Sequence, residues 1–226
     1  MLILTKIAKL CNFAISMANI LYIHGMGGGS DSRIPSILAD ALSVYGISVH
    51  VRTYDFDPET ASAQIGSWVD EIRPDLVIGE SLGSLHAIRI SGVPHLFVSP
   101  ALNAPLYFEL MAWLCLIPGM TLLFDRIYKP REGDRQILHF TFSTLKKYRQ
   151  HRRSALALST RNGGKDRFFA FIGTQDHYRK SGVVSVRTWK KYFGDTFRTY
   201  DGTHFMEEEH IYSMLVPEIL DTLNIK

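Results

Sequence analysis

A serine flanked by two glycines, placed between an apolar run and a helical segment, constrains this chain more than any other feature. Residues 76–85 read LVIGESLGSL, so Gly79-x-Ser81-x-Gly83 follows a short β-branched run. A serine on a sharp strand-to-helix turn takes a strained backbone conformation, and the two glycines leave room for the neighbouring backbone. Such a turn exposes the serine hydroxyl at the edge of a sheet. The pattern therefore predicts that Ser81 is a nucleophile on a strand-turn-helix unit.

The context of this motif matters more than the motif itself. Three fixed residues of these types occur by chance in about one chain of this size in ten. A chance match seldom falls between a buried strand and a helix, although a glycine-rich turn with an idle serine stays open as an alternative. The helix that begins here directs free backbone N–H groups, that of Leu82 first, toward any developing negative charge.

The order of apolar and helical segments predicts an α/β fold. We expect a mostly parallel, doubly wound sheet of about six strands with helices on both faces. Strands are expected at Ile20–Ile23, Ser48–Thr53, Leu76–Ile78, His95–Val98, Phe168–Ile172 and Thr196–Thr199. Helices are expected at Ser32–Val44, Pro58–Ile72, Leu82–Ile90 and Glu207–Leu223.

Length, charge and cysteine content exclude several classes of protein. A chain of 226 residues fits one domain with a single core. Its net charge of +3 is too small to indicate nucleic acid or an anionic membrane as a partner. Cys11 and Cys115 form neither a disulfide framework nor a metal-site spacing, which favours a reducing, cytoplasmic location.

The N-terminal segment does not have the pattern of a signal peptide. Lys6 and Lys9 interrupt its apolar residues, whereas a signal peptide places its charge before an uninterrupted apolar run. Met17 directly precedes the first expected strand. We therefore interpret residues 1–16 as an appendage or a mis-assigned start, and residues 17–226 as the domain.

The stretch from 101 to 165 is too long for an ordinary strand-to-helix connection. Residues 105–124 are strongly apolar and residues 146–153 are basic. Glu109 and Pro118 interrupt the apolar part, which makes it a poor membrane span. We interpret 101–165 as a helical cap inserted over the carboxyl edge of the sheet, with a plain packing insertion as the alternative.

A glycine-rich loop, HGMGGG at positions 24–29, follows the first expected strand. In acyl transfer, the tetrahedral oxyanion needs two preorganised N–H donors. Leu82 is expected to supply one, and Met26 or Gly27 the other. His24 and Gly25 are expected at the substrate site, with His24 bracing the loop. The loop lacks both the dinucleotide spacing and the Gly-Lys-Ser/Thr ending of a nucleotide loop, so no cofactor is predicted.

A serine nucleophile needs a histidine to accept its proton. His204 lies in a turn after the last expected strand and before the last helix, which makes it the best candidate among nine histidines. His210 falls inside that helix and His177 adjoins the candidate acid. His86, His95 and His139 are expected to be packing residues rather than catalytic ones.

The histidine in turn needs a carboxylate to orient it. Asp176 follows an apolar strand in the sequence FIGTQD, whereas Asp166 precedes that strand and so lies at the wrong end of the sheet. Asp201 is close to His204 in sequence but is expected to shape the turn. The segment HFMEEEH, residues 204–210, has neither spacing of the zinc-helix motifs, so no metal site is predicted.

Together these four segments resemble the α/β-hydrolase family, and in particular the small bacterial serine esterases that lack the leading strand pair. The resemblance covers most of residues 18–100 and 167–224. It implies Ser81 as nucleophile, Asp176 as acid and His204 as base, with the Met26 and Leu82 amides as oxyanion donors. Segment 101–165 matches no part of the family pattern, and no role is inferred for Glu80, at a position the family varies.

The expected activity is hydrolysis of a carboxylic ester or thioester of a small or acyl-chain substrate through an acyl-enzyme on Ser81. Amide or peptide cleavage, acyl transfer with the same triad, and a non-catalytic binding protein remain alternatives. Nucleic acid is not expected as a partner. Contact with a membrane surface, through residues 1–16 or the segment 101–165, is a less favoured alternative.

Overall fold

The computed structural model describes residues 18–130, 132–159 and 167–225. The expected appendage at residues 1–16 lies outside them, as does Met17, so the interpretation of the N-terminus stays a prediction.

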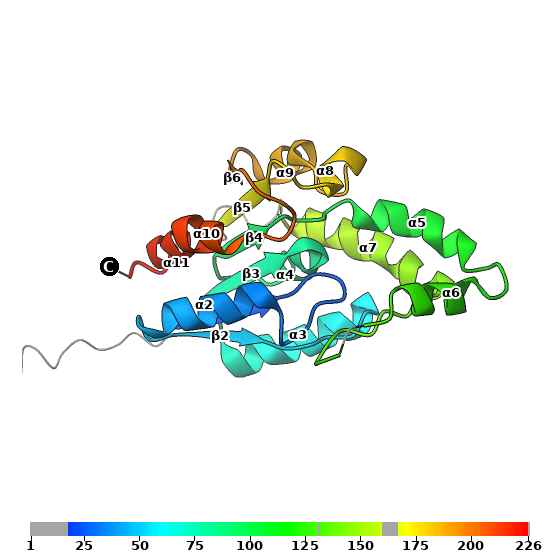
Figure 1. Ribbon diagram of the computed structural model, residues 1–226, viewed down its shortest axis with the longest axis horizontal. Helices are drawn as coiled ribbons and strands as arrows, with labels where there is room; N and C mark the ends of the chain where they lie inside the picture. The colour runs from blue at the N-terminus through cyan, green and yellow to red at the C-terminus, as the bar shows by residue number, and fades with distance from the viewer. Residues whose placement is uncertain (1–17, 131, 160–166, 226) are drawn as a thin grey trace, which may run out of the picture.

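Within the described residues, six parallel strands form one sheet in the order β2-β1-β3-β4-β5-β6 (Figure 1). Each predicted strand is present, with ends that shift by at most two residues. Because the chain winds outward from β1 in both directions, the connections that follow β1 and β3 leave the sheet in opposite directions, and a site forms outside the carboxyl ends of these strands. The strands are β1 (Ala18–Ile23), β2 (Ile47–Val51), β3 (Leu76–Glu80), β4 (His95–Val98), β5 (Phe168–Gly173) and β6 (Phe197–Tyr200).

Helices cover both faces of the sheet, and the side chains of β1 alternate between two cores. Ile20 and Tyr22 pack toward α2 (Arg33–Ser43) and the C-terminal helical run. Leu21 and Ile23 belong to the opposite core, which also holds residues of the remaining helices. Those helices are α3 (Pro58–Ile72), α4 (Ser84–Ala87), α5 (Ala104–Leu114), α7 (Phe142–Ser159) and α9 (Val186–Phe193).

Local sequence explains how α3 begins and ends. Asp57 is the N-cap residue, and its side chain accepts hydrogen bonds from the N–H groups of Glu59 and Thr60. Pro58 occupies the first turn, where its missing N–H costs nothing. The helix ends before Arg73, which has a left-handed φ of 49°. The predicted bounds of this helix are therefore confirmed.

Two other helix predictions need correction. The helix expected at Leu82–Ile90 is a 3-10 turn, Ser81–Gly83, followed by the four-residue α4. The helix expected at Glu207–Leu223 contains a π-helical turn, Ile211–Leu215, between α10 (Glu208–His210) and α11 (Val216–Thr222). Pro217, the second residue after this π turn, has no N–H to continue an α-helical pattern.

Segment 101–165 forms three helices in its described part, α5, α6 (Met120–Ile127) and α7. The apolar stretch 105–124 is not one helix, because Pro118 and Gly119, with φ +87°, separate α5 from α6. The basic stretch 146–153 lies on α7, which buries Leu145 and Tyr148 against the sheet core. In the described part of the chain, no helix has both the length and the apolar character needed to cross a bilayer.

Candidate active site

Ser81 follows β3 directly and has a positive φ of 48°, which an L-residue adopts only under strain. The two glycines of the motif permit this turn. A Cβ at Gly79 would lie 2.8 Å from the Cβ of Ala87, and one at Gly83 would overlap the carbonyl oxygens of Ile23 and His24. Glycine is therefore required at both positions for the turn to pack between α4 and the end of β1.

The serine hydroxyl belongs to an unbroken hydrogen-bonded chain of three side chains. His204 Nε2 lies 2.9 Å from Ser81 Oγ, and His204 Nδ1 lies 2.8 Å from Asp176 Oδ2. The histidine and the aspartate are each only 2% exposed. This is the arrangement in which a carboxylate orients a histidine toward a hydroxyl.

The pKa of Asp176 lies below its ordinary value although the group is buried. Burial by itself raises the pKa of this carboxyl, but the hydrogen bonds from His204 and from the Tyr178 N–H outweigh that effect. The Tyr178 N–H donates to Asp176 Oδ1 over 2.8 Å and belongs to α8 (Tyr178–Ser181). Asp176 therefore stays ionised at neutral pH, as an orienting carboxylate must.

The acid and histidine loops are joined to each other after β5 and β6. The N–H groups of Thr174 and Gln175 donate to the carbonyl oxygens of Tyr200 and Gly202. Asp201 adds a second connection, because its Oδ1 accepts hydrogen bonds from the side chains of both Thr174 and Gln175. The expectation that Asp201 shapes the turn is in accord with these contacts.

The glycine-rich loop lies against the serine. A Cβ at Gly25 would stand 3.0 Å from the Cβ of Ser81, so any larger residue would press the loop against the nucleophile. The Gly27 N–H donates to Gln136 Oε1 over 3.0 Å, so this amide already has a partner and Gly27 is the weaker of the two loop donors considered. Within the described residues, the structure gives the N–H groups of Met26 and Leu82 no hydrogen-bond acceptor.

His24 lies beneath this loop rather than at its surface, which corrects its placement among substrate contacts. Its ring is fully buried, stacks on Tyr54 at a centroid distance of 4.3 Å, and places Nδ1 2.8 Å from the Gly25 carbonyl oxygen. Burial lowers the pKa of His24 to about 4. The neutral ring thus has the bracing position that the sequence predicted.

Two polar side chains near the site were given no role in the predictions from sequence. Gln136, from the inserted segment, donates through Nε2 to the carbonyl oxygens of Tyr54 and Asp55 while it accepts the Gly27 N–H. Glu80, just before the nucleophile, is 8% exposed and accepts a hydrogen bond of 2.9 Å from the Tyr22 hydroxyl. Burial raises the pKa of Glu80. Glu80 ends an otherwise apolar strand, and this position was a sequence signal for burial at the site. No comparable sequence pattern surrounds Gln136.

The other histidines do not join the hydrogen-bonded chain. His86 and His95 are buried, as expected of packing residues, but His139 is exposed and paired with Asp125 at 2.8 Å. The packing role expected for His139 was therefore wrong. His210 lies on the C-terminal helical run against Tyr200, with ring centroids 4.9 Å apart.

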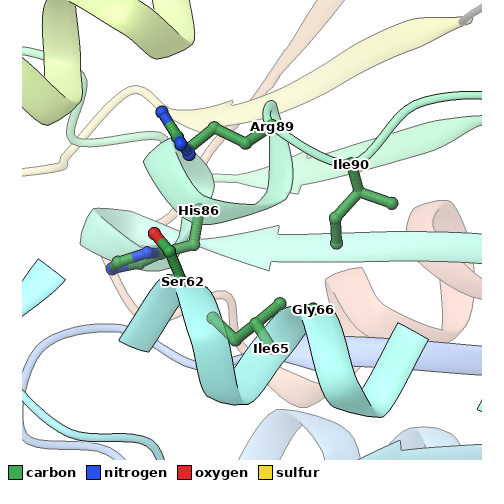
Figure 2. A pocket seen from close by; sticks show the side chains of 6 residues that line it. All are labelled: Ser62, Ile65, Gly66, His86, Arg89 and Ile90. Carbon is green, nitrogen blue, oxygen red and sulfur yellow. The ribbon is translucent and has the colours of Figure 1, made fainter. Parts of the chain in front are cut away.

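A small hollow between α3 and α4 lies apart from this arrangement (Figure 2). Helix α3 supplies three of its lining residues, α4 one and the segment after α4 two, namely Ser62, Ile65, Gly66, His86, Arg89 and Ile90 (Figure 2). None of the residues in the Ser81–His204–Asp176 chain lines this hollow.

Exposed apolar groups surround the serine and histidine. The Tyr178 ring meets His204 edge to face at a centroid distance of 4.7 Å. Met26, Tyr178 and Phe205 are 37%, 38% and 58% exposed. Burial, and then the nearby phenol of Tyr128 at the end of α6, raise the pKa of Tyr178. The Tyr107 hydroxyl of α5 donates a hydrogen bond to the Ser181 carbonyl oxygen of α8, so the inserted segment approaches the site from this side.

Neither a protein-family model nor a curated protein sequence matches this chain. Solved structures do. A monoacylglycerol lipase of Paleococcus ferrophilus matches with TM-score 0.63 and 17% identity over 90% of this chain and 94% of that one. Est1E of Butyrivibrio proteoclasticus, with bound ferulic acid, matches with TM-score 0.65 and 16% identity over 95% and 92%. Tomato methylketone synthase I matches with TM-score 0.60 and 8% identity over 92% and 98%. At such identities the likeness shows the fold alone.

Proposed function

We propose that this chain, which has the α/β-hydrolase fold, is a serine hydrolase that cleaves a carboxylic ester or thioester through an acyl-enzyme on Ser81. The observation that carries the proposal is the continuous chain from Ser81 Oγ through His204 to Asp176, with contacts of 2.9 and 2.8 Å. To bury three hydrogen-bonded polar side chains around a strained turn is energetically unfavourable. This arrangement fits a nucleophile and its base better than it fits a structural role.

In the first half-reaction, Ser81 Oγ attacks the carbonyl carbon while its proton passes to His204 Nε2. The carbonyl electron pair moves to oxygen, and the oxyanion accepts hydrogen bonds from the Leu82 and Met26 N–H groups. Asp176 stabilises the imidazolium that forms. When the tetrahedral intermediate collapses, the alcohol or thiol leaves and takes the proton from His204.

In the second half-reaction, His204 deprotonates a water molecule that attacks the acyl-enzyme carbonyl. The second tetrahedral intermediate returns its electron pair, expels Ser81 Oγ and releases the carboxylic acid. His204 gives its proton back to the serine, which restores the starting state. No other group is needed for the proton balance.

The substrate class follows from the surroundings of the serine. Exposed apolar side chains at Met26, Tyr178 and Phe205 favour an uncharged or acyl-chain ester over a phosphorylated one. We assign the inserted segment 101–165 the role of a cap beside this site. Among the apolar residues of this segment, Phe108 is 5% exposed and belongs to the core, whereas Leu106, Trp113 and Leu114 are exposed.

Intact-mass analysis after exposure to a fluorophosphonate probe tests the proposal without knowledge of the substrate. We expect one adduct on the wild-type chain and none on Ser81→Ala. Substrate profiling with esters, thioesters and amides of increasing chain length then separates ester hydrolysis from amide cleavage and acyl transfer. An unlabelled but folded wild-type chain would instead favour a binding protein with this fold.

A further inference from the structure

The hairpin formed by α5, the turn 115–119 and α6 exposes large apolar side chains at one end of the molecule. Of the eighteen exposed large hydrophobic residues in the described chain, eleven lie between Leu106 and Tyr128. Leu110, Leu122 and Ile127 are 67%, 74% and 61% exposed. Figure 1 shows α6 at the end of the molecule opposite the C-terminus. Soluble monomers rarely expose apolar residues in such density.

Helix α6 contributes little to the core. None of its residues is buried, although five of the eight are Met, Leu, Phe or Ile. Phe124 contacts Phe140 at a centroid distance of 5.9 Å and anchors the helix. By contrast, α5 buries Phe108 and Ala112. The apolar composition of α6 is therefore not explained by packing within this chain.

The turn between the two helices is also apolar. Leu116 and Ile117 are 56% and 53% exposed, and Pro118 and Gly119 follow them at the surface. Turns that face water are usually built from Gly, Pro, Asn, Asp and Ser, and of this turn only Pro118 and Gly119 are of these types. A protruding turn of leucine and isoleucine fits an environment that is less polar than water.

The charged residues in and beside the hairpin indicate what kind of apolar partner would cover it. Glu109 of α5 is held in ion pairs with Lys146 and Arg149 of the neighbouring helix α7, and Asp125 of α6 contacts the His139 ring at 2.8 Å. Arg126 and Lys129 are exposed beside the apolar side chains. Among the lysine, arginine and carboxylate groups named here, four cations stand against two carboxylates, and two of those cations come from α7. An apolar surface with surplus positive charge complements the interface of an anionic bilayer.

We propose that the α5–α6 hairpin docks the protein on the surface of an anionic phospholipid bilayer, with its apolar turn and α6 in the interface. In a symmetric pairing of two chains through this surface, Arg126 and Lys129 would instead meet a second surface with the same surplus of positive charge. The hairpin also lies near the proposed active site, because the Tyr107 hydroxyl of α5 donates a hydrogen bond to the Ser181 carbonyl oxygen of α8, and Tyr178 of α8 packs on His204.

Flotation with vesicles tests the docking, and a Ser81→Ala background separates it from the proposed hydrolysis. We expect the chain to float with phosphatidylcholine vesicles that contain phosphatidylglycerol, and more weakly with phosphatidylcholine alone or at high salt. Leu122→Ser combined with Ile127→Ser should lower the partition coefficient at least ~10-fold, because two large side chains no longer leave water. Arg126→Glu should weaken binding only to the anionic vesicles.

Val44→Ser is the matched control, because Val44 is 82% exposed at the end of α2 and outside the hairpin. It should bind vesicles like the parent chain. The proposal is overturned if the folded parent chain does not float, or if the Leu122→Ser, Ile127→Ser variant floats equally well. A dimer in sedimentation velocity that this double variant abolishes, without any flotation of the parent, would assign the surface to a second copy.

Discussion

The loops that carry Ser81, Asp176 and His204 and the α5–α6 hairpin both lie beyond the carboxyl ends of strands, yet they differ in what they bury. The loops take polar groups out of water and give each one a partner, as the 2.8 and 2.9 Å contacts of His204 show. The hairpin leaves apolar groups in contact with solvent. Each choice is unfavourable in isolation, because a buried polar group needs partners and an exposed apolar surface orders water.

The difference teaches which feature of each region is under functional constraint. In the loops it is geometry, since a buried imidazole between a carboxylate and a hydroxyl works only at hydrogen-bonding distance. In the hairpin it is composition, because a surface that meets lipid needs apolar area and charge rather than exact positions. Substitutions should therefore act on activity in the first region and on association in the second.

The largest effect is expected for the histidine and its acid. His204→Ala should lower the rate of ester hydrolysis ~10⁴-fold or more, and Asp176→Asn by about 10²–10⁴-fold, because the imidazole loses its role or its orientation. His210→Gln, six positions along the chain and outside the hydrogen-bonded chain, is the control and should keep full activity. An Asp176→Asn variant with unchanged kcat/KM would remove Asp176 from the mechanism.

A pair of apolar truncations sharpens the comparison through stability. Phe97 on β4 is fully buried and meets Trp189 at a centroid distance of 5.2 Å. Phe97→Ala should lower the free energy of unfolding by about 3–5 kcal/mol, whereas Leu122→Ala in α6 should change it by less than ~0.5 kcal/mol. Urea unfolding measures both. Equal losses would mean that α6 packs as core does, contrary to its exposure.

The buried histidines near the glycine-rich loop should make the fold sensitive to acid. Burial lowers the pKa of His24 and of His151 to about 4, and the pKa of His86 well below its ordinary value. At His24 and His151 the unfolded chain takes up a proton near pH ~6.5 and the folded chain only near pH 4. The free energy of unfolding should therefore fall as the pH drops through this window, by about 2 kcal/mol at pH 5 for each of these two histidines.

His151→Leu tests this directly, since it removes one of the groups while keeping an apolar side chain against His86, whose ring centroid lies 4.5 Å away. Urea unfolding of this variant at pH 7 and pH 5 should show a smaller difference than the wild type shows. A difference as large as that of the wild type would place the acid sensitivity elsewhere.

The smallest effect is expected where the inserted segment meets the site. Gln136→Ala removes the acceptor of the Gly27 N–H and should lower kcat about tenfold, because the loop that offers the Met26 N–H loses a fixed partner. Ile137→Ala is the neighbouring control, because Ile137 is 73% exposed. Equal kcat values for the two variants would show that the loop holds its position without Gln136.

The sheet and the Ser81 turn were predictable because their constraints lie within a few adjacent residues. Gly79, Ser81 and Gly83 specify the turn whatever surrounds them, and the apolar runs specify each strand of the sheet. The Asp176 and His204 candidates followed from their positions at the ends of such strands. Pro118 and Gly119, which divide the apolar stretch into two helices, are visible in the sequence. Apolar residues continue on both sides of them, so the pattern indicates one segment.

The sequence by itself determined where the strands lie along the chain, the strained serine and the candidates for its base and acid, since these depend on local conformation and on general rules of topology. Only the tertiary structure decided that Gln136 reaches Gly27 across 109 positions, that Glu80 is buried beside Tyr22, and that α7 joins the core while α6 stays exposed. Those outcomes depend on which surfaces meet when distant segments pack, and composition alone does not distinguish an apolar residue that will be covered from one that will not.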